Sequence, residues 1–425
     1  MKPLLLSTSD IEGGAARSAY RLHQGLQRCG ITTQMLVQVK SSDDPTVLDP
    51  PPNFRRDFAK SRPSFDFLPL KFYPQRQGSP FSCQWLPDRL VPRIKALSPD
   101  VINLHWIGSG YLQIETLAKL PSPIVLTLHD MWAFTGGCHY SQECDRYTQS
   151  CGSCPQLGST KNWDLSRWIW RRKAQSWQHL NLTVVTPSHW LASCVRASSL
   201  LGEKRLEIIP YGIDTDLYCP RDRRTARHLL NLPQDKPLIL AGAVNFSGDR
   251  RKGFHLLQPA LHHLQEFPGY ESAELLVYGA SRPQDDRSIP DLGMPIHYLG
   301  TLKDDLSLVL AYSAANVFVA PSLQDNLPNT VLEALACGVP SVAFKIGGMP
   351  DLIEHEQTGY LAQPFDPVDL ARGIHWILAH PERQQRLAIA ARHRAETNFP
   401  LTLQAQRYLT LFAELCERST TVKPL

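Results

Sequence analysis

Short apolar runs alternate with amphipathic stretches along the first half of the chain. Residues 15–28, after the first run, are typical of a helix. The runs are residues 3–7, 33–39, 101–104, 124–128, 183–186 and 206–209. Short apolar strands that alternate with helices are typical of a parallel sheet covered on both faces. The pattern therefore predicts a doubly wound α/β domain.

A turn-rich joint at residues 209–220 separates this series from a second one. The second series has apolar runs at residues 238–244, 274–278, 296–299, 315–320 and 341–344. A chain of 425 residues exceeds what one core usually serves. We therefore expect two doubly wound domains, residues 1–213 and 214–400. Residues 45–92 hold ten prolines and few periodic apolar positions, which predicts a long irregular excursion from the first domain.

Composition excludes some classes of protein. The 44 basic and 40 acidic residues leave a formal charge of +4, and 43% of the residues are hydrophobic. This balance is typical of a globular enzyme and does not favour nucleic-acid binding. The apolar run near the N-terminus is too short for a signal-peptide core, and later runs are too short to span a bilayer. We expect a cytoplasmic protein.

Two carboxylates carry the strongest chemical signal. Asp325 follows the apolar run 315–320, and Glu333 stands eight positions later in a helix-forming stretch. A loop and helix start at a strand's carboxyl end present free N–H groups that attract an anion such as a diphosphate. Glu333 would then reach a ribose hydroxyl, and Asp325 would accept hydrogen bonds from sugar hydroxyls. The alternative is that Asp325 is a turn or cap residue and Glu333 a solvated helix residue.

This stretch resembles the E-x7-E signature of the retaining glycosyltransferases of family 4. The resemblance implies the GT-B fold, in which two Rossmann-like domains face each other across a cleft, and a last helix, residues 401–425, that crosses back to the N-terminal domain. It also implies transfer of a hexose from a UDP-, GDP- or ADP-linked sugar to a saccharide or lipid-linked acceptor, in polysaccharide or glycolipid biosynthesis. Asp325 stands where the family has its first Glu, and Leu327-Pro328 replaces Phe-Gly, so the donor sugar is not implied.

The resemblance also assigns site residues. His129, at the end of the run 124–128, matches the histidine beside the donor sugar; on residue type alone, a structural histidine is the alternative. Asp130 would orient His129 or cap the next turn. We expect His129, Asp325 and Glu333 to form the catalytic set. The expected donor-binding residues are Gly13, Gly14, Arg250, Arg251, Lys252, Leu302, Asn326, Leu327, Asn329, Thr330 and Glu333.

Two of these assignments have a specific basis. Lys252 matches a family lysine that contacts the diphosphate, and lysine and arginine both suit phosphate oxygens. The family's arginine position holds Ala243 here, so Arg250 or Arg251 would replace it. Gly13 and Gly14 match a loop near the donor phosphate, although such a pair is often only structural. Cations and a helix dipole would stabilise the leaving diphosphate without a metal or other cofactor.

The expected chemistry is front-side substitution with retention, in which the departing phosphate takes the acceptor's proton. Double displacement through Asp325 is the less favoured route. Outside this class of enzyme, a catalytically silent nucleotide-sugar-binding protein of the same fold remains an alternative. A phosphorylase of the same fold is disfavoured because no lysine-centred pyridoxal site is recognisable.

Four cysteines cluster with the spacing C-x5-C-x6-C-x2-C in a turn-rich loop, residues 135–160. They are Cys138, Cys144, Cys151 and Cys154. Four thiolates in so short a segment predict a structural zinc site, with two disulfides or unlinked thiols as alternatives. The other six cysteines are scattered among apolar neighbours, as buried small hydrophobes are.

Residues 163–180 combine four tryptophans with four basic residues. The tryptophans are Trp163, Trp168, Trp170 and Trp177, and the basic residues are Arg167, Arg171, Arg172 and Lys173. On a helix they would form an aromatic and basic surface that suits peripheral contact with the inner face of an anionic membrane. A helix packed on the core, with solvated charges, is the alternative.

Overall fold

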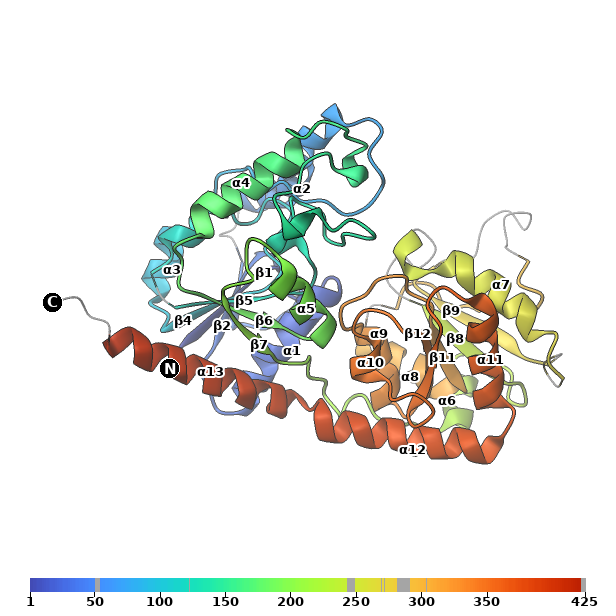
Figure 1. The fold of residues 1–425 in the computed structure, drawn as a ribbon. Helices are drawn as coiled ribbons and strands as arrows, with labels where there is room; N and C mark the ends of the chain where they lie inside the picture. The colour runs from blue at the N-terminus through green and yellow to red at the C-terminus, as the bar shows by residue number, and fades with distance from the viewer. Residues whose placement is uncertain are drawn as a thin grey trace. The chain divides into compact units, whose positions relative to one another are not determined.

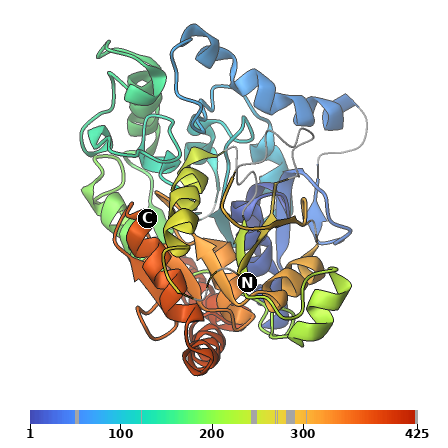
Figure 2. The ribbon, with the colours of Figure 1, turned by 90° about the vertical axis from the view of Figure 1, so that its right-hand side faces the viewer.

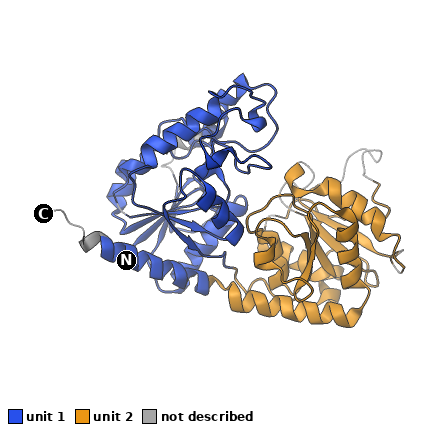
Figure 3. Ribbon diagram, in the orientation of Figure 1, with its two compact units in different colours: residues 1–212, 402–425 blue, residues 213–401 orange. Residues whose placement is uncertain are grey.

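The computed structural model describes residues 1–49, 54–121, 123–242, 249–268, 270, 272–280, 291–302 and 304–421. The chain divides into two compact units (Figure 3). The first unit is Met1–Gly212 with Thr402–Leu425, and the second is Ile213–Leu401. Each contains one parallel sheet, which confirms the prediction of two doubly wound α/β domains. Within the described part of the chain, no helix is long and apolar enough to cross a membrane.

Seven parallel strands form the sheet of the first unit, in the order β3-β2-β1-β4-β5-β6-β7 (Figure 1). They are β1 Pro3–Ser9, β2 Gln34–Val39, β3 Val47–Leu48, β4 Val101–Leu104, β5 Ile124–Thr127, β6 Leu182–Thr186 and β7 Arg205–Ile208. Strands β1, β4, β5 and β6 are buried along their whole length, as expected where both faces are covered. Leu104 of β4 pairs with Leu126 of β5, so the loops after these strands leave the same edge.

Helices cover both faces of this sheet. They are α1 Gly14–Arg28, α2 Phe54–Asp66, α3 Leu90–Leu97, α4 Leu165–Trp177, α5 His189–Ala197 and, apart from its first residue, α13 Leu401–Thr421. On one face, Leu22 of α1 and Phe412 of α13 share a core cluster. The Tyr408 hydroxyl of α13 lies 2.9 Å from Thr127 Oγ1 of β5. On the other face, Ile169 and Trp177 of α4 join a second cluster.

The second unit has six parallel strands in the order β10-β9-β8-β11-β12-β13. They are β8 Leu238–Gly242, β9 Glu274–Tyr278, β10 Ile296–Tyr298, β11 Val317–Ala320, β12 Ser341–Phe344 and β13 Gly359–Ala362. Its helices are α6 Arg223–Leu229, α7 Phe254–Leu264, α8 Asp305–Ala314, α9 Asn329–Ala336, α10 Met349–Leu352, α11 Pro367–Leu378 and α12 Pro381–Asn398. Strand β11 lies at the centre, between β8 and β12. Residues 243–244 of the predicted strand lie outside the described residues.

The prediction of an irregular excursion over residues 45–92 is wrong for much of that range. It contains β3, α2, the 3-10 helix η1 Leu68–Phe72 and the start of α3. Pro69 stands in the first turn of η1, where the missing N–H of proline costs little. The buried Asp66 at the end of α2 accepts a hydrogen bond from the Cys83 N–H at 3.0 Å. Helix α2 lies at the periphery of the first unit in both views (Figures 1 and 2).

Candidate functional site

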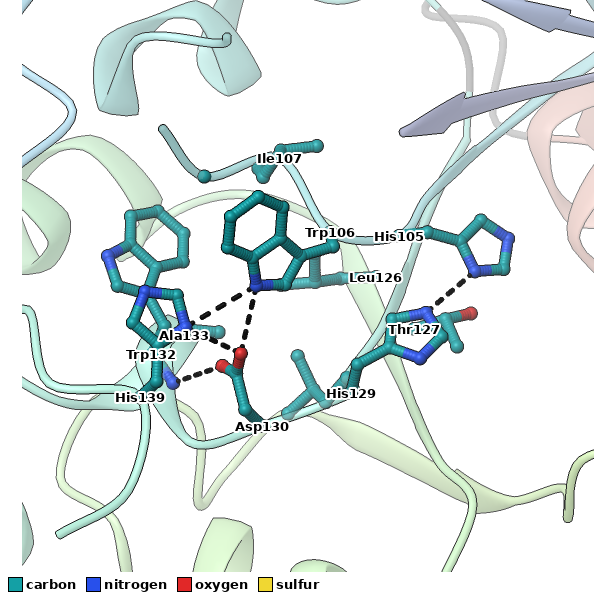
Figure 4. A pocket seen from close by; sticks show the side chains of 12 residues that line it. His105, Trp106, Ile107, Leu126, Thr127, His129, Asp130, Trp132, Ala133 and His139 are labelled. Carbon is teal, nitrogen blue, oxygen red and sulfur yellow. Dashed lines mark hydrogen bonds and ion pairs between the residues drawn. The ribbon is translucent and has the colours of Figure 1, made fainter. Parts of the chain in front are cut away.

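Side chains from the loops after β4 and β5 enclose a pocket in the first unit (Figure 4). The two strands are neighbours in the sheet, and their loops begin at His105 and Leu128. Ligands of doubly wound domains bind outside the carboxyl ends of the strands. The structure places His129 at this edge, two residues beyond the end of β5.

A chain of three polar side chains runs along the pocket. His105 Nδ1 lies 3.0 Å from His129 Nε2, and His129 Nδ1 lies 2.7 Å from the Tyr211 hydroxyl. Burial lowers the pKa of His129 to about 4 and holds the pKa of His105 well below its ordinary value. Both rings are therefore neutral at pH 7, and each offers one donor and one acceptor nitrogen. The buried Nε2 atom of His105 has no hydrogen-bond partner among the described residues.

Asp130 anchors the other side of the pocket. Its carboxylate accepts hydrogen bonds from His139 Nδ1 at 2.6 Å and Trp106 Nε1 at 2.9 Å. It also accepts one from the backbone N–H of Trp132 at 2.8 Å, so it caps the next turn, one of the two roles expected for it. Burial raises the pKa of Asp130, but His139 and the hydrogen bonds outweigh burial and hold the pKa below its ordinary value. The carboxylate is thus charged and fixes both aromatic rings.

Asp325 lies in the loop after β11 and is only 6% exposed. Its Oδ2 atom accepts a hydrogen bond from Lys252 Nζ at 2.7 Å and lies 3.5 Å from Arg251 Nη1. Burial raises the pKa of Asp325, but Lys252 and Arg251 outweigh burial and hold the pKa below its ordinary value. The basic run and the first carboxylate, 73 positions apart in sequence, therefore form one cluster of charges.

Hydrogen bonds of the Arg251 backbone and side chain hold the basic run against this loop. Arg250–Lys252 form one 3-10 turn, η6. The Leu323 N–H donates to the Arg251 carbonyl at 2.8 Å, and Arg251 Nη1 donates to the Gln324 carbonyl at 2.9 Å. Gly253 has φ +75°, and a Cβ there would lie 1.7 Å from the Pro321 carbonyl oxygen. Glycine is therefore required at 253 for η6 to pack this closely. Of the two arginines, Arg251 reaches Asp325.

Glu333 lies in α9, one turn after the helix begins. It is 3% exposed, and its Oε2 atom accepts a hydrogen bond from the Tyr312 hydroxyl at 3.1 Å. The alternative that Glu333 is a solvated helix residue is therefore wrong. Pro328 is the N-cap of α9 and makes no side-chain cap. The first backbone N–H groups of a helix lack partners within the helix, so the end at Asn329 and Thr330 can bind an anion.

The remaining predicted residues fall into two groups. Gly13 and Gly14 belong to the first unit with His129; Gly13, with φ +91°, directly precedes α1. Arg250 to Lys252, Leu302, Asn326, Leu327, Asn329, Thr330 and Glu333 belong to the second unit with Asp325. Asn326 and Leu327 are buried beside Asp325, whereas Leu302 lies in the loop after β10. Ala243 lies outside the described residues.

The four clustered cysteines line one cavity in the first unit. Cys138 and Cys154 are buried, Cys144 and Cys151 are half-buried, and all ten cysteines are free thiols. Burial raises the pKa of Cys151 to about 12 and raises the pKa of Cys138 and Cys154 as well. In the residues that the structure covers, no group of three or more His, Cys, Asp or Glu side chains has the arrangement of a metal site. Structural zinc remains a prediction.

Comparison with known proteins covers most of the chain. Residues 12–217 match the model of the family described as Glycosyltransferase Family 4, and residues 236–380 match that of Glycosyl transferases group 1. The sulfoquinovosyl transferase of Arabidopsis thaliana is 29% identical over 330 residues, which are 76% of this chain and 58% of that protein. The chain thus spans little more than half the length of this relative.

Solved structures share the fold over nearly the whole chain. Sucrose-phosphate synthase from Thermosynechococcus elongatus has a TM-score of 0.68 at 21% identity and covers 98% of this chain and 100% of its own. HepE of Anabaena, solved in complex with UDP and glucose, has a TM-score of 0.61 at 17% identity, with coverage of 98% and 100%. At these identities the likeness shows the fold alone.

Proposed function

Because the chain belongs to the family-4 glycosyltransferases of group 1, we propose that it transfers a hexose from a nucleoside-diphosphate sugar to a saccharide or lipid-linked acceptor. The reaction would serve polysaccharide or glycolipid biosynthesis in the cytoplasm. The observation that carries the proposal is the cluster in which Asp325 meets Lys252 and Arg251 close to the uncapped start of α9. A buried carboxylate, two cations and the N-terminal end of a helix together suit a ligand that joins a sugar to a diphosphate.

In this proposal the second unit binds the donor. The first amides of α9, Lys252 and Arg251 would hold the diphosphate, and Glu333 would bond a ribose hydroxyl. Negative charge grows on the diphosphate as the anomeric C–O bond breaks, so cations preorganised at that position stabilise the transition state. Because these groups belong to the chain itself, we propose that the reaction needs no metal ion.

Asp325 and His129 would position the sugar. The charged Asp325 carboxylate accepts hydrogen bonds from hydroxyls. Both ring nitrogens of His129 contact His105 and Tyr211, so a sugar hydroxyl would replace one of these two partners; the neutral ring would place no positive charge beside an oxocarbenium-like centre. We propose front-side substitution with retention, in which the leaving phosphate accepts the proton of the acceptor hydroxyl. The UDP complex of HepE supports a nucleoside diphosphate as the leaving group and does not assign the base.

Donor turnover tests this function. Purified protein is incubated with UDP-, GDP- and ADP-sugars and membrane extract, and released nucleoside diphosphate is measured. We expect one donor class to turn over, with a loss of at least about a hundredfold in kcat for Lys252→Met, the scale of losing one transition-state charge contact. Lys236→Met, which changes an exposed lysine of the same unit, is the control. Tight binding of a nucleotide with no turnover of any donor would favour the silent binding protein.

A further inference from the structure

Exposed aromatic side chains gather on two segments of the first unit. Phe72 is 85% exposed and Trp163 is 60% exposed. The structure shows thirteen large apolar side chains as exposed among its described residues, and six of them lie in residues 65–72 and 163–168. We call these six, Phe65, Phe67, Leu68, Phe72, Trp163 and Trp168, the aromatic surface. A concentration of exposed apolar side chains marks an interaction site more often than isolated ones do.

Hydrogen bonds join the two segments side by side. The Leu165 N–H at the start of α4 donates to the Tyr73 hydroxyl at 2.9 Å. The Gln77 N–H donates to the Gln156 carbonyl at 2.8 Å. Figure 1 shows α4 and α2 together at one end of the first unit. The end of α2, helix η1 and the start of α4 therefore present their exposed side chains from adjoining parts of one unit.

The exposed charged side chains in and around these two segments are all basic. Residues 60–80 and 155–180 contain nine lysines and arginines and two aspartates. Both aspartates are buried and bonded to backbone: Asp66 accepts from the Cys83 N–H, and Asp164 accepts from the Cys154 N–H at 2.8 Å. The exposed charged side chains of the two segments are all basic: Lys60, Lys71, Arg76, Lys161 and Arg171. The Arg171 guanidinium also lies over the Trp163 ring, 5.0 Å from its centre.

Helix α4 shows that these aromatic residues are not needed for the core. Its inner face packs through Ile169 and Trp177, which are fully or almost fully buried. Trp163 and Trp168 remain 60% and 40% exposed. The interpretation of a helix packed on the core therefore holds for Ile169 and Trp177, whereas Trp163 and Trp168 lie at the surface. Segment 65–72, which the sequence pattern did not single out, adds four more exposed apolar side chains.

We propose that the aromatic surface and its basic residues dock the protein onto an anionic lipid bilayer. Aromatic side chains favour the boundary between lipid headgroups and acyl chains, and adjacent basic residues are attracted to anionic headgroups. The proposal deepens the proposed function, because it names the surface at which a lipid-linked acceptor would meet the enzyme. Binding to lipid can nevertheless be measured without a donor or an acceptor.

Co-sedimentation with lipid vesicles tests the proposal. The full chain is mixed with vesicles of phosphatidylcholine alone or of phosphatidylcholine with phosphatidylglycerol. We expect binding to the anionic vesicles only, weakened by salt. The double variant Phe72→Ser/Trp163→Ser should lower the partition coefficient at least about tenfold. Lys71→Gln/Arg171→Gln should remove most of the preference for anionic lipid. The matched control, Leu306→Ser/Ile389→Ser, changes two apolar side chains of the second unit that are 60% and 61% exposed and should bind as the wild type does.

Three results overturn the proposal. They are no binding of the wild type to anionic vesicles, equal binding of the Phe72/Trp163 variant, and an equal loss in the control. Self-association that the Phe72/Trp163 variant abolishes, without vesicle binding, would show that a second copy occupies the surface. Because all these side chains are exposed, the variants should retain the circular dichroism of the wild type. Donor turnover with a soluble acceptor should be unchanged, so a failure of lipid docking is distinct from a failure of the transferase assignment.

Discussion

Removing the charge of Lys252 gives a prediction whose size follows from the structure. Lys252 Nζ lies 2.7 Å from the buried Oδ2 atom of Asp325, a separation at which two unit charges attract by about 6 kcal/mol at an effective dielectric constant of about 20. Removing one partner of a buried pair costs about 3–5 kcal/mol after desolvation is included. Because Arg251 remains 3.5 Å away, we expect Lys252→Met to cost about 3 kcal/mol, the lower end of that range.

Hydrogen exchange of the β11–α9 segment measures this cost locally. A loss of about 3 kcal/mol raises the exchange rate of the best protected amides by about a hundredfold. The pKa of Asp325 should also rise, because Lys252 no longer opposes burial. The ion pair stabilises the fold above the unfolded-state pKa of Asp325, and this contribution is lost as pH falls through the folded-state pKa. In Lys252→Met the carboxylate lacks its nearest cation, so its protonation as pH falls should relieve part of the cost instead.

A second variant and a control make this test decisive. Asp325→Asn in the Lys252→Met background removes the uncompensated charge, so the double variant should exchange more slowly than Lys252→Met alone. Lys236→Met should change exchange by no more than about twofold, as surface substitutions do. Unchanged exchange in Lys252→Met, or a double variant with the two costs simply added, would show that Lys252 and Asp325 do not stabilise the fold as a pair.

Three further predictions concern other parts of the chain. Because the pKa of His129 is lowered to about 4, unfolding at acid pH takes up a proton at this residue. His129→Gln should therefore flatten the dependence of the melting temperature on pH between about 4 and 6.5. An unchanged slope would contradict this. If the cysteine cluster holds zinc, elemental analysis should find about one zinc per chain. The zinc should be lost in Cys154→Ser and retained in Cys194→Ser. Less than about half an equivalent of zinc in the wild type counts against the site. Gly347→Ala should weaken donor binding, because Gly347 has φ +52° and a Cβ there would lie 2.0 Å from a carbonyl oxygen of the loop before α9. The control Gly78→Ala, where a Cβ meets nothing within 4 Å, should bind the donor as the wild type does. Equal affinity of the two variants would show that the loop before α9 tolerates a Cβ at position 347.

The strands could be predicted because their apolar runs are short and bounded by turn residues. The predicted ends of six strands agree with the structure to within two residues. These strands are β1, β4, β5, β9, β11 and β12. The Pro-rich segment could not be predicted in this way, because its order comes from tertiary contacts. Asp66, for example, ends α2 with its side chain buried against the backbone of Cys83, a contact that no local pattern indicates.

The candidate site shows the same division. The spacing of Asp325 and Glu333 placed both carboxylates in β11–α9, but their partners Lys252 and Tyr312 come from distant segments. His105 and His139 were missed. His105 directly follows β4 as His129 follows β5, so its position after an apolar run was a usable signal. His139 lies among the cysteines, and only the folded chain brings it to Asp130.

Binding of two nucleotides to the wild type and to one variant tests the role of the cations at the start of α9. In the proposed function, cations beside the start of α9 hold the β-phosphate of the donor. The dissociation constants of the best-binding nucleoside diphosphate and of its monophosphate are measured by calorimetry for the wild type and Lys252→Met. We expect the wild type to prefer the diphosphate by at least about tenfold, or about 1.4 kcal/mol, and the variant to lose that preference. The same preference in both proteins would contradict the claim.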